Sequence, residues 1–224
     1  VKAASLVDNV LVMSHESEDK YKHNYPATSS KLLVLPLGAH IPDVTEQAPP
    51  ESLPTEFFLF FGRIDKYKGI GNLLSACASI SELKIPLVIA GKGNLSDNEV
   101  TLLNKTKTIL LNRYIKDEEM IWLFKKAKFV VLPYIQATQS GIIPIAYSFG
   151  KPVITSDVEG LTQFVVNRRT GIICSNAQDY QEAITYMSEN DLKSMSIKCK
   201  EYYNTKLDWK ANLQVLFRRM DFEI

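Results

Sequence analysis

The chain has 224 residues, of which 46% are hydrophobic and 23% charged, a composition typical of a protein that buries a sizeable core. Its 26 Lys and Arg residues nearly balance its 25 Asp and Glu residues, and the formal net charge of +1 argues against a nucleic-acid partner. No stretch approaches the roughly 20 apolar residues of a membrane-spanning helix, which does not exclude peripheral contact with a membrane.

The first 38 residues alternate apolar and polar segments. Short apolar runs predict strands at 9–14 and 31–36, and the charged segment between them, 16–23, predicts a helix. The chain starts without Met inside such a patterned segment, so we expect it to be a fragment of a longer protein. Residues 39–55 are predicted to be a linker because they have little apolar periodicity and four prolines, Pro42, Pro49, Pro50 and Pro54.

From residue 56 onward, apolar runs alternate regularly with amphipathic segments. Such alternation is typical of a parallel sheet covered on both faces, so residues 56–206 are predicted to form a doubly wound α/β domain. The predicted strands are 57–61, 87–90, 108–111, 129–132, 152–155 and 171–174, and the predicted helices are 70–80, 97–105, 117–126, 141–149 and 177–187, with a short turn or helix at 161–165. Residues 192–224 are expected to be entirely helical, with 207–224 packing toward a missing amino-terminal domain.

The three cysteines, Cys77, Cys174 and Cys199, are an odd set without CxxC spacing. Cys77 and Cys174 lie in apolar segments, where a free cysteine packs as a small hydrophobic residue. We therefore expect free thiols and a cytoplasmic location, at the inner face of the membrane if the whole protein associates with one.

The first candidate site lies in the loop after the strand at 57–61. Ligands of doubly wound sheets bind outside the carboxyl ends of the strands, where the loops at Gly62, Gly91 and Pro133 emerge. The sequence FFLFFGRIDKYKGIG places Arg63 and Lys68 in the first of these loops, just before a predicted helix. Two cations and the amides of a helix N-terminus can converge on one phosphate group. A pair of solvated surface cations is the alternative interpretation, and the spacing by itself favours it.

The second candidate is the turn in YIQATQSGIIPIAYSFGKPV, where a predicted strand gives way to a helix. Thr138 and Gln139 lead into this turn, Ser140 is the predicted N-cap, and the amides of Gly141 and Ile142 are expected to face the same edge of the sheet as Arg63. Together with the first loop, this arrangement suits a diphosphate. An ordinary capped core helix is the alternative.

Other motifs are weaker. Tyr114 and Ile115 follow a predicted strand and could line a planar ring, although plain packing explains them equally well. Gly91 and Gly93 form a GxG turn, but no GK[ST] follows, so a P-loop ATPase is excluded. The histidines lack metal-ligand spacing and no metal site is predicted.

Taken together, these segments resemble the carboxy-terminal, donor-binding half of retaining GT-B glycosyltransferases of the group 1 (family 4) type. The resemblance rests on FFGRIDKYKGIGNLL, LVIAGKGN, LLNRYIKDEEMIWLFKKAKFVVLPY and ATQSGIIPIAYSFGKPVITSDVEGL, in that order. Residues 1–38 resemble the end of the amino-terminal Rossmann-like domain and the crossover. By this resemblance Arg63 and Lys68 bind the donor pyrophosphate, residues 139–142 surround the sugar and phosphate, and Tyr114 and Ile115 contact the base.

The chain departs from the family at two positions. The family usually shows a Glu-x7-Glu pattern, with one Glu by the donor sugar and the other by the ribose, but this chain has Ala137 and Ile145 there. The resemblance leaves Thr138, Gln139 or Ser140 as candidates for the replacement contacts.

The implied activity is transfer of a sugar from a UDP-, GDP- or ADP-sugar donor to a hydroxyl of a glycan, a lipid-linked acceptor or another molecule. Transfer proceeds with retention and without a further cofactor, in polysaccharide or glycoconjugate biosynthesis, and the fragment alone is expected to be inactive. A non-catalytic nucleotide-sugar binding module, or a degenerate partner subunit of a glycosyltransferase, is the alternative. A sugar-nucleotide epimerase is disfavoured because we find no carboxylates for the cleft.

Overall fold

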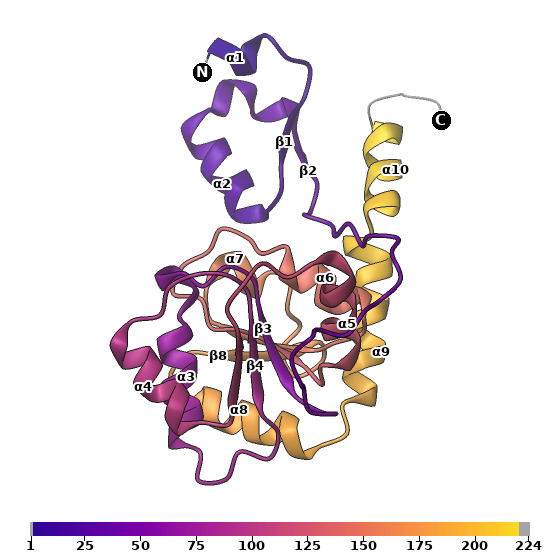
Figure 1. Cartoon of the computed structure of the whole chain (residues 1–224). Coiled ribbons are helices and arrows are strands. Elements are labelled where there is room, and N and C mark those ends of the chain that lie inside the picture. The colour runs from indigo at the N-terminus through magenta and orange to yellow at the C-terminus, as the bar shows by residue number, and fades with distance from the viewer. Residues whose placement is uncertain (1, 220–224) are drawn as a thin grey trace.

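The computed structural model describes residues 2–219, apart from the side chains of Lys2, Ala3, Ala211, Val215 and Arg219. A six-stranded parallel sheet forms the centre of its larger part (Figure 1). The strands are β3 (Phe58–Phe61), β4 (Leu87–Ala90), β5 (Thr108–Leu111), β6 (Val130–Leu132), β7 (Val153–Ser156) and β8 (Gly171–Cys174). The predicted doubly wound α/β domain is confirmed.

The order of the strands reverses in the middle of this sheet. The spatial order is β5-β4-β3-β6-β7-β8, so the chain moves outward from β3 to one edge and then returns to place β6 against β3. In sheets of this kind a crevice opens at the carboxyl ends of the two strands where the order reverses. The loops after β3 and β6 therefore border the place where a ligand is expected.

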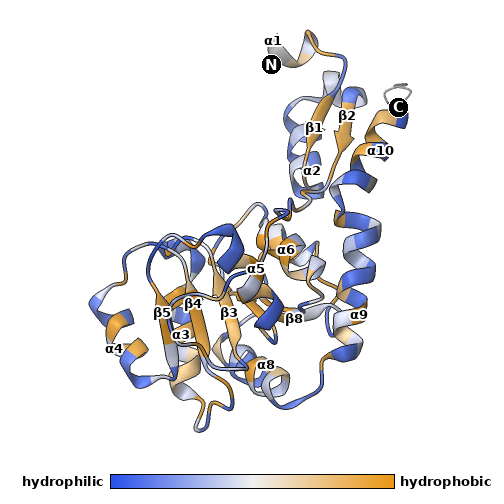
Figure 2. Ribbon diagram, turned by 45° about the vertical axis from the view of Figure 1, so that its right-hand side comes forward, coloured by the Kyte–Doolittle hydropathy of each residue, from blue (hydrophilic) through white to orange (hydrophobic). Residues whose placement is uncertain are grey.

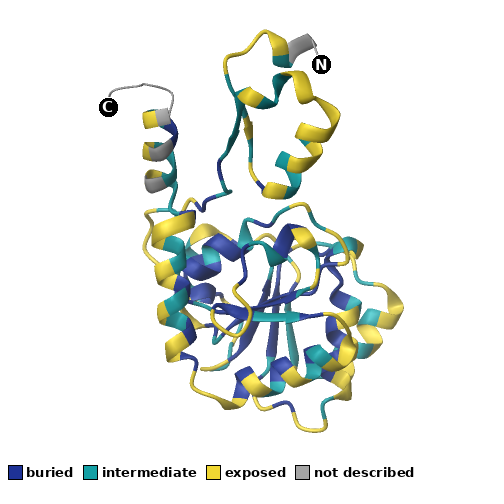
Figure 3. Cartoon of the chain, turned by 180° about the vertical axis from the view of Figure 1, so that it is seen from behind, coloured by how far each residue is buried: buried dark blue, intermediate teal, exposed yellow. Residues whose placement is uncertain are grey.

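Helices cover both faces of the sheet. The elements α3 (Ile70–Ser79), α4 (Asp97–Lys105) and α8 (Ala177–Glu189) lie together on one face. On the other face lie α5 (Asp117–Lys126), the two-turn α6 (Ile142–Ser148) and α9 (Lys193–Tyr202), while α7 (Glu159–Thr162) follows β7. The sheet is apolar (Figure 2) and its central strands are buried (Figure 3), because residues from Phe57 to Phe60 and from Leu87 to Ala90 have no exposed surface.

The first residues form a small separate layer at the carboxyl edge of the large sheet (Figure 1). After α1 (Lys2–Ser5), strand β1 (Val10–Val12) pairs in parallel with β2 (Leu32–Val34), and the chain between them forms α2 (His15–Asn24) and a 3-10 helix at Pro26–Lys31. No helix or strand is assigned between β2 and β3 in the described chain. The N-terminal end of α2 points down toward the loops of the large sheet.

The C-terminal region is not helical throughout, in contrast to the expectation for residues 192–224. A turn of π-helix at Tyr203–Leu207 follows α9, Asp208 is extended, and α10 (Trp209–Arg219) begins anew. The crossover segment causes the break, because Ala39 pairs with Asp208 in a parallel bridge and Gly38 packs against the Leu207 carbonyl and the Trp209 ring. The helix α10 runs beside β2 (Figure 2), and Asn212 Nδ2 donates to the Pro36 carbonyl over 3.5 Å. Residues 220–224 of the predicted helix lie outside the described residues.

The cysteines are buried and free, as predicted for small hydrophobic residues. Burial raises the pKa of the Cys77, Cys174 and Cys199 thiols to about 12, which keeps them protonated and unreactive. Within residues 2–219, we find no helix with the length and apolarity needed to cross a bilayer.

Candidate functional site

Close packing between loops shapes the crevice at the end of β3. Gly91 has a φ of +150°, and a Cβ atom there would lie only 2.1 Å from the Gly62 carbonyl oxygen. Gly69 has a φ of +66°, and its Cβ atom would lie 1.9 Å from the Pro133 carbonyl oxygen. Only glycine fits at both contacts. The loop that carries the two predicted cations is thereby held against the loop after β4 and the loop after β6.

Lys68 is a buried cation without a carboxylate partner. Lys68 is the last residue of the 3-10 turn Lys66–Lys68, and it is only 8% exposed. The Nζ atom donates to Tyr134 Oη over 3.1 Å and lies 4.9 Å from the centroid of the same ring. No carboxylate of residues 2–219 comes within ion-pair distance of it. Because a buried charge is costly unless it is paired, this ammonium is prepared for an anion.

Burial also lowers the pKa of Lys68, and the positive charge of Arg63 lowers it further, while Tyr67 and Asp65 oppose this effect. Burial raises the pKa of Tyr134 to about 12, so its hydroxyl stays protonated. An anion that binds Lys68 would therefore meet an ammonium and an intact phenol.

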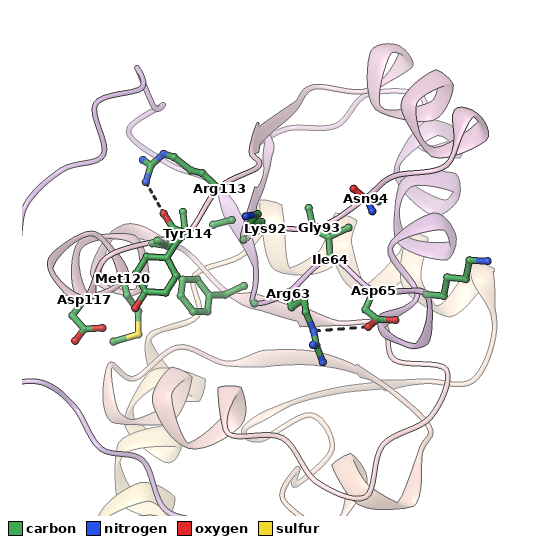
Figure 4. Close-up of a pocket in the computed structure, with 16 residues that line it drawn as sticks. Arg63, Ile64, Asp65, Lys92, Gly93, Asn94, Arg113, Tyr114, Asp117 and Met120 are labelled. Atoms are coloured by element: carbon green, nitrogen blue, oxygen red, sulfur yellow. Dashed lines mark hydrogen bonds and ion pairs between the residues drawn. The ribbon is translucent and has the colours of Figure 1, made fainter.

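Arg63 is placed differently. Its side chain is 71% exposed and its Nε atom lies 3.8 Å from Asp65 Oδ2, a weak ion pair in solvent. Figure 4 shows it at the edge of a cavity of about 830 Å³, which we call the Arg63 cavity. That cavity is lined by Phe61, Gly62, Arg63, Ile64, Asp65, Lys66, Ala90, Gly91, Lys92, Gly93, Asn94, Arg113, Tyr114, Ile115, Asp117 and Met120.

The predicted ring-binding residues line the same Arg63 cavity. Tyr114 is 74% exposed, with its ring near Met120 in Figure 4, whereas Ile115 is buried. Their loop is held by Arg113, which forms bidentate ion pairs with Glu51 of the linker and Glu119 of α5. The side chain of Arg113 also donates to the Tyr114 carbonyl over 3.1 Å. One wall of the cavity is therefore a rigid loop that offers an exposed aromatic ring.

A second cavity, of about 710 Å³, contains the other predicted residues, and we call it the Lys68 cavity. It is lined by Tyr67, Lys68, Tyr134, Gln136, Ala137, Thr138, Gln139, Ser140, Gly141 and Ile142, and by Glu16 from the small N-terminal layer. The two cavities adjoin along the loop from Gly62 to Lys68, because a Cβ atom on Gly62 would lie 2.9 Å from Lys68 Nζ. The structure thus brings Arg63 together with Tyr114 and Ile115, and Lys68 together with residues 138–142. The two cations do not line the same cavity.

The predicted N-cap of α6 was wrong by one residue. Gly141 occupies the N-cap position and already has helical backbone angles, with φ −68° and ψ −11°. Ser140 is buried, and its Oγ atom accepts from the Ile142 amide over 3.2 Å. The hydroxyl therefore still stabilises the first turn, but from the residue before the cap.

Glu16 also lines the Lys68 cavity, although the sequence did not predict it. In sequence it belongs to a polar, highly charged helix, which is typical of a solvated surface, and no local signal separates it from Glu18 or Asp19. In the structure Glu16 Oε1 pairs with Lys20, whereas Glu16 Oε2 is buried and has no hydrogen-bond partner among the described residues. Only the fold brings this carboxylate to the Lys68 cavity.

The Lys68 cavity lies between the loops after β3 and β6, where the strand order reverses, and the Arg63 cavity adjoins it over the loops after β3, β4 and β5. Doubly wound α/β domains bind their ligands at this place in the sheet. A family model for glycosyl transferases group 1 matches residues 44–205. The chain belongs to this family, and the resemblance found in its sequence is confirmed.

Two curated relatives support the assignment of this chain to the group 1 family. The D-inositol 3-phosphate glycosyltransferase of Corynebacterium aurimucosum is 25% identical over 220 residues, which cover 86% of this chain and 52% of the relative. The O-antigen chain mannosyltransferase C of Escherichia coli is 26% identical over 183 residues, 74% of this chain and 48% of the relative. This chain therefore spans about half the length of these curated relatives.

Solved structures show the same fold. The sucrose-phosphate synthase of Thermosynechococcus elongatus superposes with a TM-score of 0.74 at 21% identity, over 98% of this chain and 60% of that one. Anabaena HepE in complex with UDP and glucose superposes with a TM-score of 0.76 at 16% identity, over 96% of this chain and 63% of that one.

Proposed function

We propose that the crevice between β3 and β6 binds the nucleoside-diphosphate sugar donor of a retaining glycosyltransferase, and that the full-length protein transfers the sugar to an acceptor hydroxyl. The observation that carries this proposal is the buried, unpaired ammonium of Lys68 at the switch point of the sheet. A pyrophosphate offers the anionic oxygens that this ammonium lacks. Arg63, on the same loop, has an exposed guanidinium that can reach the other side of the pyrophosphate.

The arrangement of the two cavities supports an orientation for the donor. The Arg63 cavity has the exposed ring of Tyr114 and the buried side chains of Ile115 and Met120, surfaces suited to a nucleobase. The Lys68 cavity lies on the other side of the cations and is lined by polar groups from Thr138 to Ser140, suited to a sugar. HepE, which superposes on 96% of this chain, was solved with UDP and glucose.

The proposed cations act on the leaving group. When the bond from the anomeric carbon to the pyrophosphate breaks, negative charge develops on the departing diphosphate, so cations that already face it lower the barrier. A hydrogen bond to a charged group contributes about 1.5–3 kcal/mol, which corresponds to roughly a tenfold to 150-fold change in rate. We propose Arg63 and Lys68 as the residues that supply this stabilisation.

Two relatives carry the names O-antigen chain mannosyltransferase C and, in Mycobacterium tuberculosis, glycogen synthase. On the ground of these names, we propose polysaccharide or glycoconjugate synthesis in the cytoplasm for the full-length protein. The division of the chain into residues 1–38, 39–55, 56–206 and 207–224 belongs to this proposal. In it, the first and last segments connect to an amino-terminal domain that carries the acceptor site, so the fragment alone is inactive.

A second candidate is a nucleotide-sugar binding module or partner subunit without catalysis. The observation that favours it is the apolar side chain at Ala137 and Ile145, where the resemblance leads one to expect carboxylates. Calorimetric titration of the full-length protein with UDP, GDP and ADP, followed by turnover assays with the matching sugar nucleotides, separates the two candidates. Binding with turnover supports the transferase, binding without turnover supports the module, and no binding of any nucleotide overturns both.

A further inference from the structure

The Lys68 cavity contains a carboxylate that comes from outside the large sheet. Glu16 is the only acidic residue among the described residues that line this cavity, and it lies in the first turn of α2. Its side chain is 14% exposed. One oxygen, Oε1, is paired with Lys20, and the other, Oε2, is buried without a partner. A buried carboxylate oxygen without a donor is a costly arrangement, which a ligand with hydroxyl groups would relieve.

We propose that Glu16 binds the hydroxyl groups of the donor sugar, and so replaces from the N-terminal layer the carboxylate that the loop at Ala137 does not provide. This inference rests on the proposed function, since it requires a sugar nucleotide in the crevice. It assigns Glu16 as a specificity-determining residue that accepts hydrogen bonds from the sugar.

The chemistry of the cavity selects the sugar as the partner of Glu16. A carboxylate repels the diphosphate, which the cations on the loop from Gly62 to Lys68 attract. The nucleoside is assigned to the Arg63 cavity, on the far side of that loop. The part of the donor left for the Lys68 cavity is the sugar, whose hydroxyl groups donate the hydrogen bonds that Glu16 Oε2 lacks.

Several contacts hold α2 against the loops of the large sheet. The His15 amide donates to Gln163 Oε1 over 3.3 Å, and Gln139 Nε2 approaches Met13 Sδ at 3.7 Å. Ser14 caps the helix, since its Oγ atom accepts from the Ser17 amide over 3.1 Å. The first turn of α2, which carries Glu16, is therefore fixed at the mouth of the Lys68 cavity.

A second polar atom in the cavity points to the same ligand. Gln139 Oε1 is buried and has no hydrogen-bond partner among the described residues. It lines the Lys68 cavity together with Glu16. Two unsatisfied acceptors that line one cavity, one from α2 and one from the loop before α6, match a ligand that donates several hydrogen bonds, as a sugar does.

The test compares Glu16→Gln with Glu18→Gln in the full-length protein. Both changes remove one carboxylate from α2, but Glu18 pairs with Lys22 and His15 and does not line the cavity. For each variant and the wild type, calorimetry measures the affinity for UDP, GDP and ADP, and for UDP-glucose, UDP-N-acetylglucosamine, GDP-mannose and ADP-glucose. The quantity that matters is the sugar increment, the ratio of the affinity for a sugar nucleotide to that for its nucleoside diphosphate.

We expect Glu16→Gln to reduce the sugar increment on the order of tenfold or more and to leave the affinity for the nucleoside diphosphate unchanged. Glu18→Gln is expected to change neither. An unchanged sugar increment in Glu16→Gln overturns the inference, as does an equal loss for nucleotide and sugar nucleotide, which would mean a structural role. In both cases the proposed function stands, because the wild type still binds the nucleotides. If the wild type binds none of them, the proposed function fails and this inference with it.

Discussion

The ammonium of Lys68 lies 3.1 Å from the phenolic oxygen of Tyr134, and these two residues come from the loops after β3 and β6, the strands at which the sheet reverses its order. A cation and a hydroxyl are thus joined across the crevice before any ligand is bound. The burial that lowers the pKa of Lys68 also makes its charge effective toward an anion, because little water competes for it.

Replacing Lys68 with Met removes this buried charge while keeping a side chain of similar length. We expect the affinity of the full-length protein for a nucleoside diphosphate to fall on the order of tenfold to a hundredfold, since one charge-assisted hydrogen bond is lost. The melting temperature is expected to stay level or rise, because the cation has no carboxylate partner to lose. Lys105→Met, at an exposed position on α4, is the control. If its affinity for the nucleoside diphosphate falls as much as that of Lys68→Met, the assignment of Lys68 to the pyrophosphate is contradicted.

The pH dependence of the same contact has a definite sign. Because the pKa of folded Lys68 is lowered from 10.5, the lysine loses its proton in the folded protein at a lower pH than in the unfolded chain. The unfolded chain then binds more protons, so Lys68 makes stability rise as the pH increases through the folded pKa toward 10.5. Chemical denaturation of the wild type and Lys68→Met across this alkaline range tests the effect. The wild type is expected to gain stability relative to Lys68→Met as the pH rises, so that any excess in the unfolding free energy of Lys68→Met becomes smaller. A difference in unfolding free energy that stays constant with pH contradicts this effect.

Substitution of Arg63 by Ala is expected to separate binding and catalysis from stability. Its side chain is largely exposed and its ion pair with Asp65 is long, so the free energy of unfolding is expected to change by less than about 0.5 kcal/mol. Turnover of the donor by the full-length protein is expected to fall at least about tenfold, because the guanidinium faces the proposed leaving group. Arg169→Ala, at an exposed position between α7 and β8, is a matched control, and wild-type turnover by Arg63→Ala refutes the proposed role.

Two glycines that are two residues apart in the sequence, Gly69 and Gly71, offer a paired test of loop geometry. Gly69 has a positive φ and contacts the Pro133 carbonyl, so Gly69→Ala is expected to cost about 1–3 kcal/mol of stability and to displace Lys68. Gly71 lies in α3, where an added Cβ atom meets only the flexible side chain of Glu99 at 3.2 Å. Gly71→Ala is therefore expected to be neutral or to stabilise by up to about 1 kcal/mol. Equal free energies of unfolding for the two variants in denaturant titrations would contradict the claim that the backbone at Gly69 requires glycine.

The ion pairs of Arg113 are expected to make the protein sensitive to acid. Hydrogen bonding to Arg113 lowers the pKa of Glu119 from 4.5, so the contribution of this carboxylate to stability is present above 4.5 and is lost as the pH falls through the folded pKa. Glu119→Gln is expected to lose about 1–3 kcal/mol near pH 7 and to show a shallower loss on acidification. Glu118→Gln, on the same turn of α5, is the comparison. Identical acid unfolding curves for wild type and Glu119→Gln would rule out this role.

Much of the large sheet could be predicted from local patterns. The predicted strands at 87–90, 108–111 and 171–174 and the helices at 97–105 and 117–126 have the observed bounds. Local signals explain this success, as in α4, where Ser96 and Glu99 form a capping box within four residues. The break at Asp208 could not be predicted in this way, because its cause is Ala39, which lies 169 residues earlier in the chain.

The candidate site likewise combines features that local sequence predicts with features that depend on distant segments. Arg63, Lys68 and the turn from Thr138 to Ile142 could be proposed as site residues because they lie in loops that follow buried strands, and the carboxyl ends of parallel strands meet at one edge. The burial of Lys68 was not recognisable, since it depends on Tyr134 from a strand reached only after the sheet reverses its order.

The amino-acid order alone determined the alternation of strands and helices, the family and the loops in which cations occur, since periodicity and caps act over a few residues. The tertiary structure decided that Arg63 and Lys68 line two adjoining cavities and that Glu16 enters one of them. Such relationships depend on where distant segments cross and which water they exclude, and no short stretch of the chain encodes either.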